Sequence, residues 1–330
     1  MVIDTHAHYL PGALLGALEK RERSPRVFDR DGRPFIEYGE RSAQPLTPAF
    51  TDVDVLLERM REAGIDHSVL SVTIPGVDWF DLRDATALAR DCNAEMAELC
   101  RSHPDQISGL ATVPLQFPEL AVDVLQSAVR DGLKGAMIYS NVAGGHLDDP
   151  DRRQFFDAAA ELDAPILLHP TYPLCAPTVA VHGMLEIAGF LFDTTTAALR
   201  LVFDGLYERH PDFKFIVPHA ASLIPYFVGR IDHFGVNRPG SAGDLTGLPS
   251  DHIRRFFTDT VCNWPPAIRL SIDFFGVDKI MLGSDHPFWP MSIAKNVLDD
   301  LELSASDRAK IEFENAVRLF QLSIPSAVGT

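Results

Sequence analysis

Short apolar runs that suit buried strands alternate along the chain with longer segments whose apolar residues recur at helical spacing. The first run starts at Val2 and leads into His6-Ala7-His8. The pattern predicts further strands at 65–74, 107–113, 133–139, 165–169, 213–219, 256–260 and 279–285. It predicts helices from a cap at Thr51 or Asp52 to Gly64, and at about 83–102, 118–131, 151–163, 179–209, 220–234, 265–276, 292–301 and 305–321.

Strands that alternate with helices indicate parallel pairing through right-handed crossovers. Eight such strands favour a closed (β/α)8 TIM barrel of the α/β class, with residues 1–330 forming a single barrel. An open doubly wound sheet is the alternative. That fold would place a glycine-rich phosphate turn after a strand, and the chain contains no such turn.

The segment at about 10–50 interrupts the alternation and is polar and rich in turn residues. Asp31-Gly32 stands between two β-prone pieces, Arg26–Phe28 and Pro34–Tyr38, which is typical of a hairpin. We expect this segment to be a small β insertion that leans over the mouth of the barrel.

Composition narrows the range of partners. Acidic residues outnumber basic ones by 46 to 29, for a formal charge of −17, and no basic run is present. Nucleic acid and anionic membranes are therefore not expected as partners. No signal peptide is expected, and no uncharged apolar run reaches the length of about 18 residues at which a membrane span is suspected. The four cysteines form no C-x-x-C pair, which favours reduced thiols in the cytoplasm.

Polar side chains stand at the ends of the predicted strands. His6 and His8 point to the same face of the first strand, since residues i and i+2 do so. His169, His219 and Asp285 end three later strands, and in a barrel all these ends meet at one mouth. Three histidines and a carboxylate suit Zn²⁺ or a similar divalent ion with an open position for water.

The other histidines are expected to have different roles. His103 and His210 precede Pro-Asp at predicted helix ends, where capping is the favoured interpretation. His286 follows Asp285 directly and is a candidate for lining the pocket. The remaining ones lack a strand-end position and are not expected to touch metal: His67, His146, His182, His233 and His252.

Four motifs carry a family resemblance: Asp4-Thr5-His6-Ala7-His8, Leu168-His169-Pro170, Pro218-His219 and Leu282-Gly283-Ser284-Asp285-His286-Pro287-Phe288. Together they resemble the amidohydrolase superfamily, and within it the metal-dependent decarboxylase branch that includes aminocarboxymuconate-semialdehyde decarboxylase. The resemblance implies that His6, His8, His169 and Asp285 hold the metal, with a water completing the site, and that His219 stands just outside as acid/base.

We expect one divalent ion, zinc with manganese as the alternative. Lys134 begins its strand, and Tyr139 ends it, so a lysine bridging two metals is not expected. Two positions depart from the family pattern: His219-Ala220-Ala221-Ser222 replaces a His-Gly-Gly-Gly, and His286 replaces a tyrosine.

A carboxylated substrate needs cations, and Arg41 and Arg230 are the candidates. The resemblance implies that the second arginine reaches in from a neighbouring subunit, which makes a homodimer the expected assembly. Arg230 keeps the family spacing from His219, whereas Arg41 needs a shift of three residues. Four aromatic side chains are candidates for walls of the substrate pocket: Trp79, Phe80, Phe288 and Trp289.

The expected activity is metal-dependent, non-oxidative decarboxylation of a small carboxylated aromatic or muconate-type acid. Either His219 or Asp285 is the proton donor, and the sequence does not choose between them. The alternative is a hydrolase that attacks an amide, lactone or related bond with metal-activated water. A barrel that only binds is a third possibility, and the four intact ligand positions argue against it.

Overall fold

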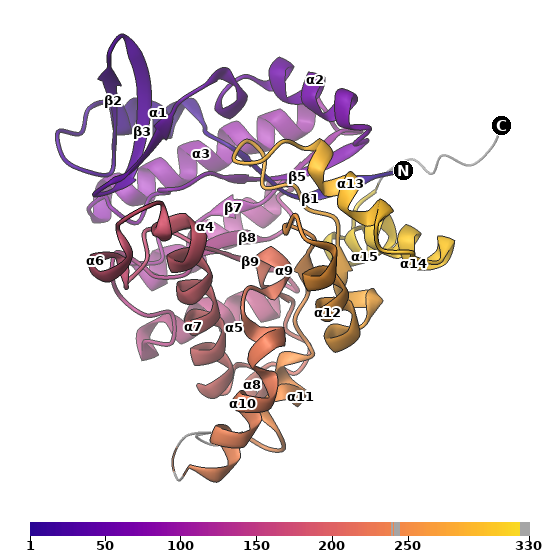
Figure 1. Ribbon diagram of the computed structural model, residues 1–330. Helices are drawn as coiled ribbons and strands as arrows, with labels where there is room; N and C mark the ends of the chain where they lie inside the picture. The colour runs from indigo at the N-terminus through magenta and orange to yellow at the C-terminus, as the bar shows by residue number, and fades with distance from the viewer. Residues whose placement is uncertain (239, 241–244, 324–330) are drawn as a thin grey trace.

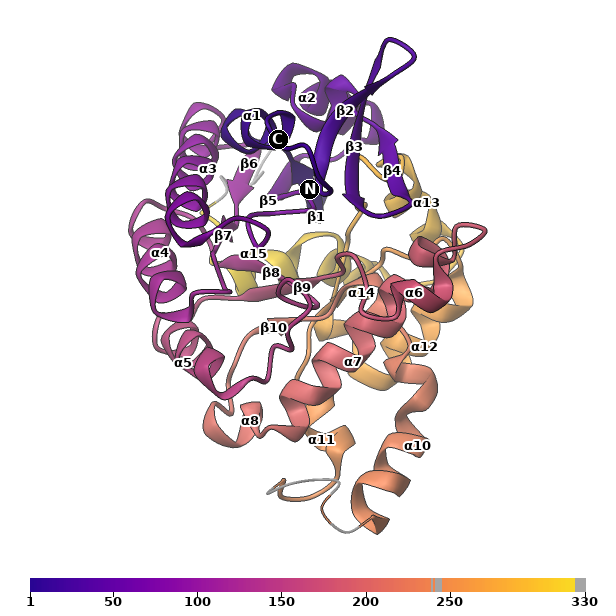
Figure 2. The ribbon, with the colours of Figure 1, turned by 90° about the vertical axis from the view of Figure 1, so that its left-hand side faces the viewer.

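The computed structural model describes residues 1–238, 240 and 245–323. A ring of short parallel strands forms its centre, and helices surround that ring (Figures 1 and 2). Three strands pair in the order β1 (Ile3–Tyr9), β5 (His67–Val72) and β6 (Ile107–Gly109). Four more pair in the order β7 (Ala111–Thr112), β8 (Ala136–Tyr139), β9 (Ile166–His169) and β10 (Phe215–Ile216). The last pair is β11 (Thr258–Asp259) with β12 (Ile280–Met281).

Backbone hydrogen bonds between these groups close the ring. Leu110 connects β6 to β7, which together make the third strand of the barrel. Phe257 N–H donates to Phe215 O at 2.9 Å, joining β11 to β10, and Thr5 N–H donates to Leu282 O at 2.9 Å, joining β1 to the end of β12. The expected (β/α)8 barrel is therefore confirmed.

The helices cover the outside of the ring. The longer ones are α1 (Gly12–Glu19), α2 (Val53–Ala63), α3 (Leu82–Ser102), α4 (Pro118–Arg130), α5 (Arg153–Glu161), α7 (Phe190–Phe203), α10 (Ile224–Asn237), α12 (Pro265–Phe275) and α13 (Ser292–Asp299). Shorter ones are α6 (Ala176–Val179), α8 (Leu206–Arg209), α11 (Pro249–Ile253), α14 (Ala305–Ala309) and α15 (Asn315–Phe320). The segment labelled α9 (Pro218–Ala221) has non-helical backbone angles inside it.

Helix α2 illustrates how local sequence sets the boundaries. The Asp52 carboxylate accepts from the backbone N–H of Asp54 at 2.9 Å and caps the first turn. Gly64 ends the helix in the left-handed conformation, with φ of 67°, which glycine adopts without a Cβ clash. Both ends lie where the sequence predicted them.

The insertion after β1 is a three-stranded antiparallel sheet rather than a single hairpin. Its strands are β2 (Arg26–Arg30), β3 (Arg33–Gly39) and β4 (Ser42–Pro45). The ring of Tyr38 lies 6.2 Å from that of Phe288, in the loop that follows β12. The insertion therefore packs over the mouth of the barrel, as expected.

Several elements have other bounds than the sequence pattern predicted. The apolar run 213–219 contributes only Phe215–Ile216 to the sheet, because Pro218 has no N–H to donate and a tight turn follows it. The helical region 179–209 is divided by two glycines at positive φ, Gly183 and Gly205. Helix α10 continues to Asn237, into the stretch expected to be loop.

Apolar side chains of the strands are part of the hydrophobic core. Ile3, Leu70, Ile138, Leu167 and Phe215 are all buried in one continuous cluster. The four cysteines form no disulfide. Among the described residues, no helix combines the length and apolar character needed to cross a membrane.

Candidate metal centre

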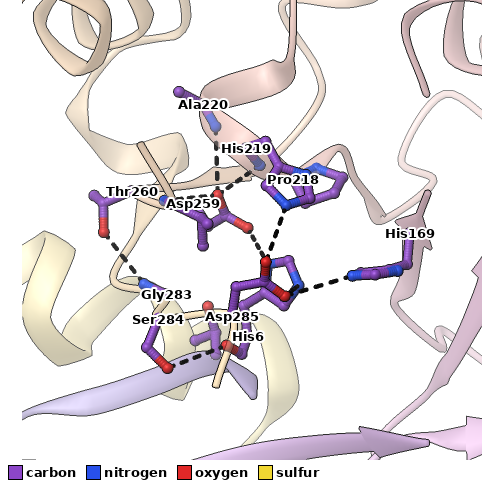
Figure 3. A network of polar contacts seen from close by, with 12 residues as sticks. His6, His169, Pro218, His219, Ala220, Asp259, Thr260, Gly283, Ser284 and Asp285 are labelled. Atoms are coloured by element: carbon purple, nitrogen blue, oxygen red, sulfur yellow. Dashed lines mark hydrogen bonds and ion pairs between the residues drawn. The ribbon is translucent and has the colours of Figure 1, made fainter. Parts of the chain in front are cut away.

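Four side chains converge at the carboxyl ends of the strands: His6, His8, His169 and Asp285. One nitrogen or oxygen atom of each lies within 4.8 Å of the corresponding atom of every other. The Oδ1 atom of Asp285 lies 3.0 Å from Nε2 of His8, 3.4 Å from Nε2 of His6 and 3.7 Å from Nε2 of His169. All four residues are buried, and Figure 3 shows His169 pointing toward Asp285.

This cluster fits a divalent metal ion. Nε2 of His6 and Nε2 of His169 are buried yet have no hydrogen-bond partner. Buried polar atoms are nearly always paired, so two orphaned imidazole nitrogens facing one carboxylate call for a further partner. Imidazole nitrogens and a carboxylate oxygen are the donor set that zinc and neighbouring transition metals accept.

The opposite ring nitrogens are held by other groups. Nδ1 of His6 donates to Oδ2 of Asp259 at 2.7 Å, and Nδ1 of His169 donates to the carbonyl of Pro170 at 2.7 Å. Nδ1 of His8 lies 2.9 Å from the hydroxyl of Ser71. A proton on Nδ1 leaves the lone pair on Nε2 free, so these contacts orient each imidazole for ligation.

A second buried carboxylate ties β1 to the segment after β12. Oδ2 of Asp4 accepts from the hydroxyl of Ser284 at 2.5 Å, and its Oδ1 accepts from the backbone N–H groups of His6 and Ser284, each at 3.0 Å. Burial raises the pKa of Asp4 to about 6, although the Ser284 and His6 contacts act against the increase. This network fixes Asp285 relative to His6.

The charge states of three of the four residues, neutral His8 and His169 and ionised Asp285, also suit a metal. Burial, assisted by the neighbouring histidines, lowers the pKa of His8 to about 3 and of His169 to about 4, so both imidazoles are neutral at neutral pH. Burial also disfavours the charged form of His6, but the hydrogen bond to Asp259 and the charges of the nearby carboxylates together outweigh this and raise its pKa to about 8. Burial opposes the charged form of Asp285 too, and the surrounding histidines nevertheless hold its pKa well below the usual range.

His219 lies beside the cluster rather than in it. Its Nε2 is 3.5 Å from Oδ2 of Asp285, and its Nδ1 is buried without a partner. Its backbone N–H donates to Oδ1 of Asp259 at 2.8 Å, as Figure 3 shows. His219, Ala220, Ala221 and Ser222 all have positive φ, between 53° and 60°. This turn aims the imidazole at Asp285.

Two of the expected pocket residues lie near the cluster. The ring of Phe288 is 5.6 Å from that of His8 and also contacts Phe50. His286 is buried, and its Nε2 has no hydrogen-bond partner. Burial lowers the pKa of His286 to about 4, so its ring is neutral.

The other expected pocket residues are not joined to the cluster. Arg41 is exposed in the turn between β3 and β4, and Arg230 is exposed on α10, stacked 4.6 Å above the Phe234 ring. Within the described residues, no hydrogen bond or ion pair connects either arginine to the four-residue cluster. Trp79 is half-buried after β5, as is its neighbour Phe80, whereas Trp289 is 39% exposed.

His103 and His210 lie at the C-terminal ends of α3 and α8, where the sequence placed them. The ring of His210 pairs with Asp157, at 2.6 Å from Nε2 to Oδ1, rather than with a helix-terminal carbonyl. His67 bridges Asp105 O and the Ser108 hydroxyl.

Tyr139 ends β8, so this strand end carries a tyrosine and not a lysine, as expected.

Sequence reasoning missed the partners that orient the ligands, above all Asp259 and Ser71. Asp259 ends β11 in the same way that His169 ends β9, so its strand-end position was an available signal. Ser71 carried no such signal, because a serine inside a β-prone run is ordinary. Only the pairing of β1 with β5, which sets His8 opposite Ser71, shows its role.

Comparisons with known proteins agree with this geometry. The profile of the amidohydrolase family matches residues 3–322. Gamma-resorcylate decarboxylase from Rhizobium sp. is 32% identical over 284 residues, which is 82% of this chain and 87% of the relative. The 2-amino-3-carboxymuconate-6-semialdehyde decarboxylase of Dictyostelium discoideum is 28% identical over 241 residues, 72% of this chain and 67% of the relative.

Solved structures match over the whole fold. The crystal structure of a dihydroxybenzoic acid decarboxylase from Polaromonas sp. JS666, with bound manganese and the inhibitor 2-nitroresorcinol, superimposes with a TM-score of 0.83 at 26% identity. The match covers 97% of each chain. The resemblance expected from the sequence motifs is confirmed.

Proposed function

This chain belongs to the amidohydrolase family, and on that premise we propose that it is a metal-dependent, non-oxidative decarboxylase of a small carboxylated aromatic or muconate-type acid. It is a carboxy-lyase by this proposal, with hydrolysis as the second candidate. Residues 1–330 are proposed to act as one barrel carrying the insertion at about 10–50. The observation that carries the proposal is the buried convergence of three histidines and Asp285 beside His219.

The relatives support lyase chemistry over hydrolysis. Both sequence relatives described above are named decarboxylases, and their substrates are a dihydroxybenzoic acid and a carboxylated muconate derivative. These two classes share a carboxylate attached to a conjugated carbon framework. We propose the same substrate class for this chain, without choosing one member of it.

We propose that His6, His8, His169 and Asp285 hold one divalent metal ion. Manganese and zinc both accept this donor set, and manganese is bound in the related dihydroxybenzoic acid decarboxylase. When bound, the ion supplies a Lewis acid that polarises substrate oxygens. The four side chains hold that charge at the bottom of a buried site, where the low dielectric strengthens its effect.

Decarboxylation leaves an electron pair on carbon, so a proton must reach that carbon. His219 is the proposed donor or relay, because its Nε2 faces Asp285 and its unpartnered Nδ1 keeps it free to exchange a proton. Asp285 is the second candidate. Its depressed pKa keeps it ionised in the metal-free site, which favours His219 as the proton source.

The pocket around the centre is proposed to bind an aromatic or muconate framework. Phe288 would form one wall, with His286 close by and Trp79 and Trp289 toward the rim. Arg41 lies on the insertion that covers the mouth, and we propose that it binds the substrate carboxylate.

Arg230 is exposed on α10 and makes no bond to the cluster of its own chain. We therefore propose that it serves the neighbouring site of a homodimer. A cytoplasmic location and a small-molecule carboxylate substrate, with no nucleic acid or membrane as partner, complete the proposal.

Product analysis separates the two candidate activities. The metal-loaded protein would be incubated with a panel of carboxylated phenols and muconate-type acids, and in parallel with amides and lactones. CO₂ release without oxygen consumption supports the proposal. Hydrolysis of an amide or lactone with no CO₂ from any acid supports the hydrolase instead. A His169→Asn variant is the control for metal-independent background.

A further inference from the structure

A cleft of about 440 Å³ opens at the end of the barrel opposite the candidate metal centre. It lies where three strands begin: Lys214 directly precedes β10, Phe257 precedes β11 and Lys279 precedes β12. Asp285 of the metal centre follows the opposite, carboxyl end of β12. The two places are therefore separated by the length of the barrel.

Four cationic side chains line this cleft with a single carboxylate, that of Asp212: Lys214, Arg255, Lys279 and Arg318. The chain as a whole is strongly acidic, with 46 acidic and 29 basic residues, so this local excess of positive charge opposes the overall composition. Like charges held close together repel one another. A cleft built in this way is favourable when an anion occupies it.

Three of the four cations have no carboxylate partner. Lys214 pairs with Asp163 at 2.5 Å. In the part of the chain that the structure describes, Arg255, Lys279 and Arg318 form no ion pair within 4.0 Å. Because no carboxylate of the described residues forms an ion pair with these three side chains, their charges can interact with a bound anion.

The unpaired cations are held in place by neutral contacts. Nη1 of Arg255 donates to Pro211 O at 3.2 Å, and Nη2 of Arg318 donates to Asp278 O at 2.8 Å. Nζ of Lys279 lies 4.0 Å from the centre of the Phe257 ring, a cation–π contact. Burial, with the charge of Arg318, lowers the pKa of Lys279, and the nearby charge of Asp278 acts against the decrease.

We propose that this cleft is a binding site for a small oxyanion with two or more negative charges, the class that includes phosphate groups and dicarboxylates. Guanidinium groups match the oxygens of such anions, and an ammonium adds a point charge. The buried Phe213 and Leu319 give the cleft an apolar wall, so a small organic body attached to the anion also fits. The volume is within the range of ligand pockets.

Calorimetric titration of the metal-loaded full chain tests the proposal. Inorganic phosphate and succinate would be titrated separately, with NaCl at matched ionic strength as the blank. We expect about one site per chain for at least one anion, and its identity tells phosphate from dicarboxylate as the source. Arg255→Gln and Lys279→Gln should each weaken binding by about tenfold or more. Arg101→Gln on α3, an exposed arginine paired with Glu98 outside the cleft, should leave binding unchanged.

A labelling experiment keeps the test valid if the variants fold poorly. Reductive methylation of the unaltered protein, followed by peptide mass spectrometry, should be slowed at Lys279 by the bound anion but not at the exposed Lys20. Two results would overturn the proposal: no binding of either anion beyond the NaCl blank, or binding that leaves the methylation of Lys279 unprotected. The proposal would also be overturned if Arg101→Gln weakened anion binding as much as the cleft variants do.

Discussion

Oδ2 of Asp259 lies 2.7 Å from Nδ1 of His6, and both side chains are buried. The other oxygen of the same carboxylate accepts the backbone N–H of His219 at 2.8 Å. One carboxylate therefore orients a proposed metal ligand and the turn that carries the proposed proton donor. Burial disfavours its charged form, but the hydrogen bond with His6 and the charges of His6 and His219 together outweigh burial and lower the pKa of Asp259, so it stays ionised in this role.

Asp259→Asn is expected to weaken metal binding without removing a ligand. The amide carries no charge to hold the Nδ1–H tautomer of His6, so affinity should fall by about 10–100-fold, as when other outer partners of metal-binding histidines are removed. Competition with a chelator measures the affinity. Asp273→Asn, at an exposed position on α12, is the control and should bind metal normally. Unchanged affinity in Asp259→Asn would refute the orienting role.

Replacing His219 should separate metal binding from turnover. His219→Asn should keep near-stoichiometric metal and lose activity by ~10²–10⁴-fold, because a proton-transfer group is lost and no ligand is. His169→Asn should lose the metal as well. Metal analysis and kinetics on the same samples measure both properties. A His219→Asn protein that is metal-free, or loaded and fully active, contradicts the assignment.

The turn after β10 is expected to be strained. Ser222 has φ of 56° and ψ of −121°, a region that only glycine occupies easily. Ser222→Gly should therefore raise the free energy of unfolding by about 1 kcal/mol. The same substitution at Ser127, inside α4, should lower it by a few tenths of a kcal/mol or more, because glycine disfavours helix. Urea denaturation measures the unfolding free energy of both variants. A change in the same direction for both substitutions would count against strain at Ser222.

Asp78 should make stability depend on pH. Burial raises its pKa from 3.8 to about 7, against the opposing charge of Arg152, and its Oδ1 has no hydrogen-bond partner. The native state therefore keeps a proton that the unfolded chain loses. The stabilising contribution is complete below about pH 4 and is lost as pH rises through about 7. Each pH unit in that window lowers stability by at most about 1.4 kcal/mol.

Asp78→Asn tests this dependence, because an amide does not titrate. As the pH rises from 4 to 7, the variant should become more stable relative to the unaltered protein. Above pH 7 the difference in unfolding free energy should stay constant. Urea denaturation at several pH values measures it. A difference that is constant with pH would disprove the raised pKa.

The sequence predicted the barrel because strand-like and helix-like periodicities are local properties. It predicted the convergence of His6 and His169 because parallel strands of a closed barrel bring their carboxyl ends to one mouth. It did not predict where strands stop. The β10 strand is cut short by Pro218 and by the positive φ of His219, and neither effect shows in hydrophobic periodicity.

Contacts across the barrel could not be predicted from the sequence for a similar reason. The Asp259 carboxylate reaches His6 across 253 positions of chain, and only the closed ring brings them together. Arg230 keeps the family spacing from His219 and lies on the exposed side of α10. Its proposed role in the site of a neighbouring subunit depends on how two chains assemble, which spacing along one chain does not specify.

The central claim is that one metal ion, held by His6, His8, His169 and Asp285, makes this chain a decarboxylase. The most direct test removes metal with a chelator and returns Mn²⁺ or Zn²⁺ stepwise, while CO₂ release from carboxylated phenols and muconate-type acids is recorded. Release should rise from near zero and level off at about one ion per chain. Full CO₂ release by the metal-free protein, or none from any of these acids at full loading, would contradict the claim.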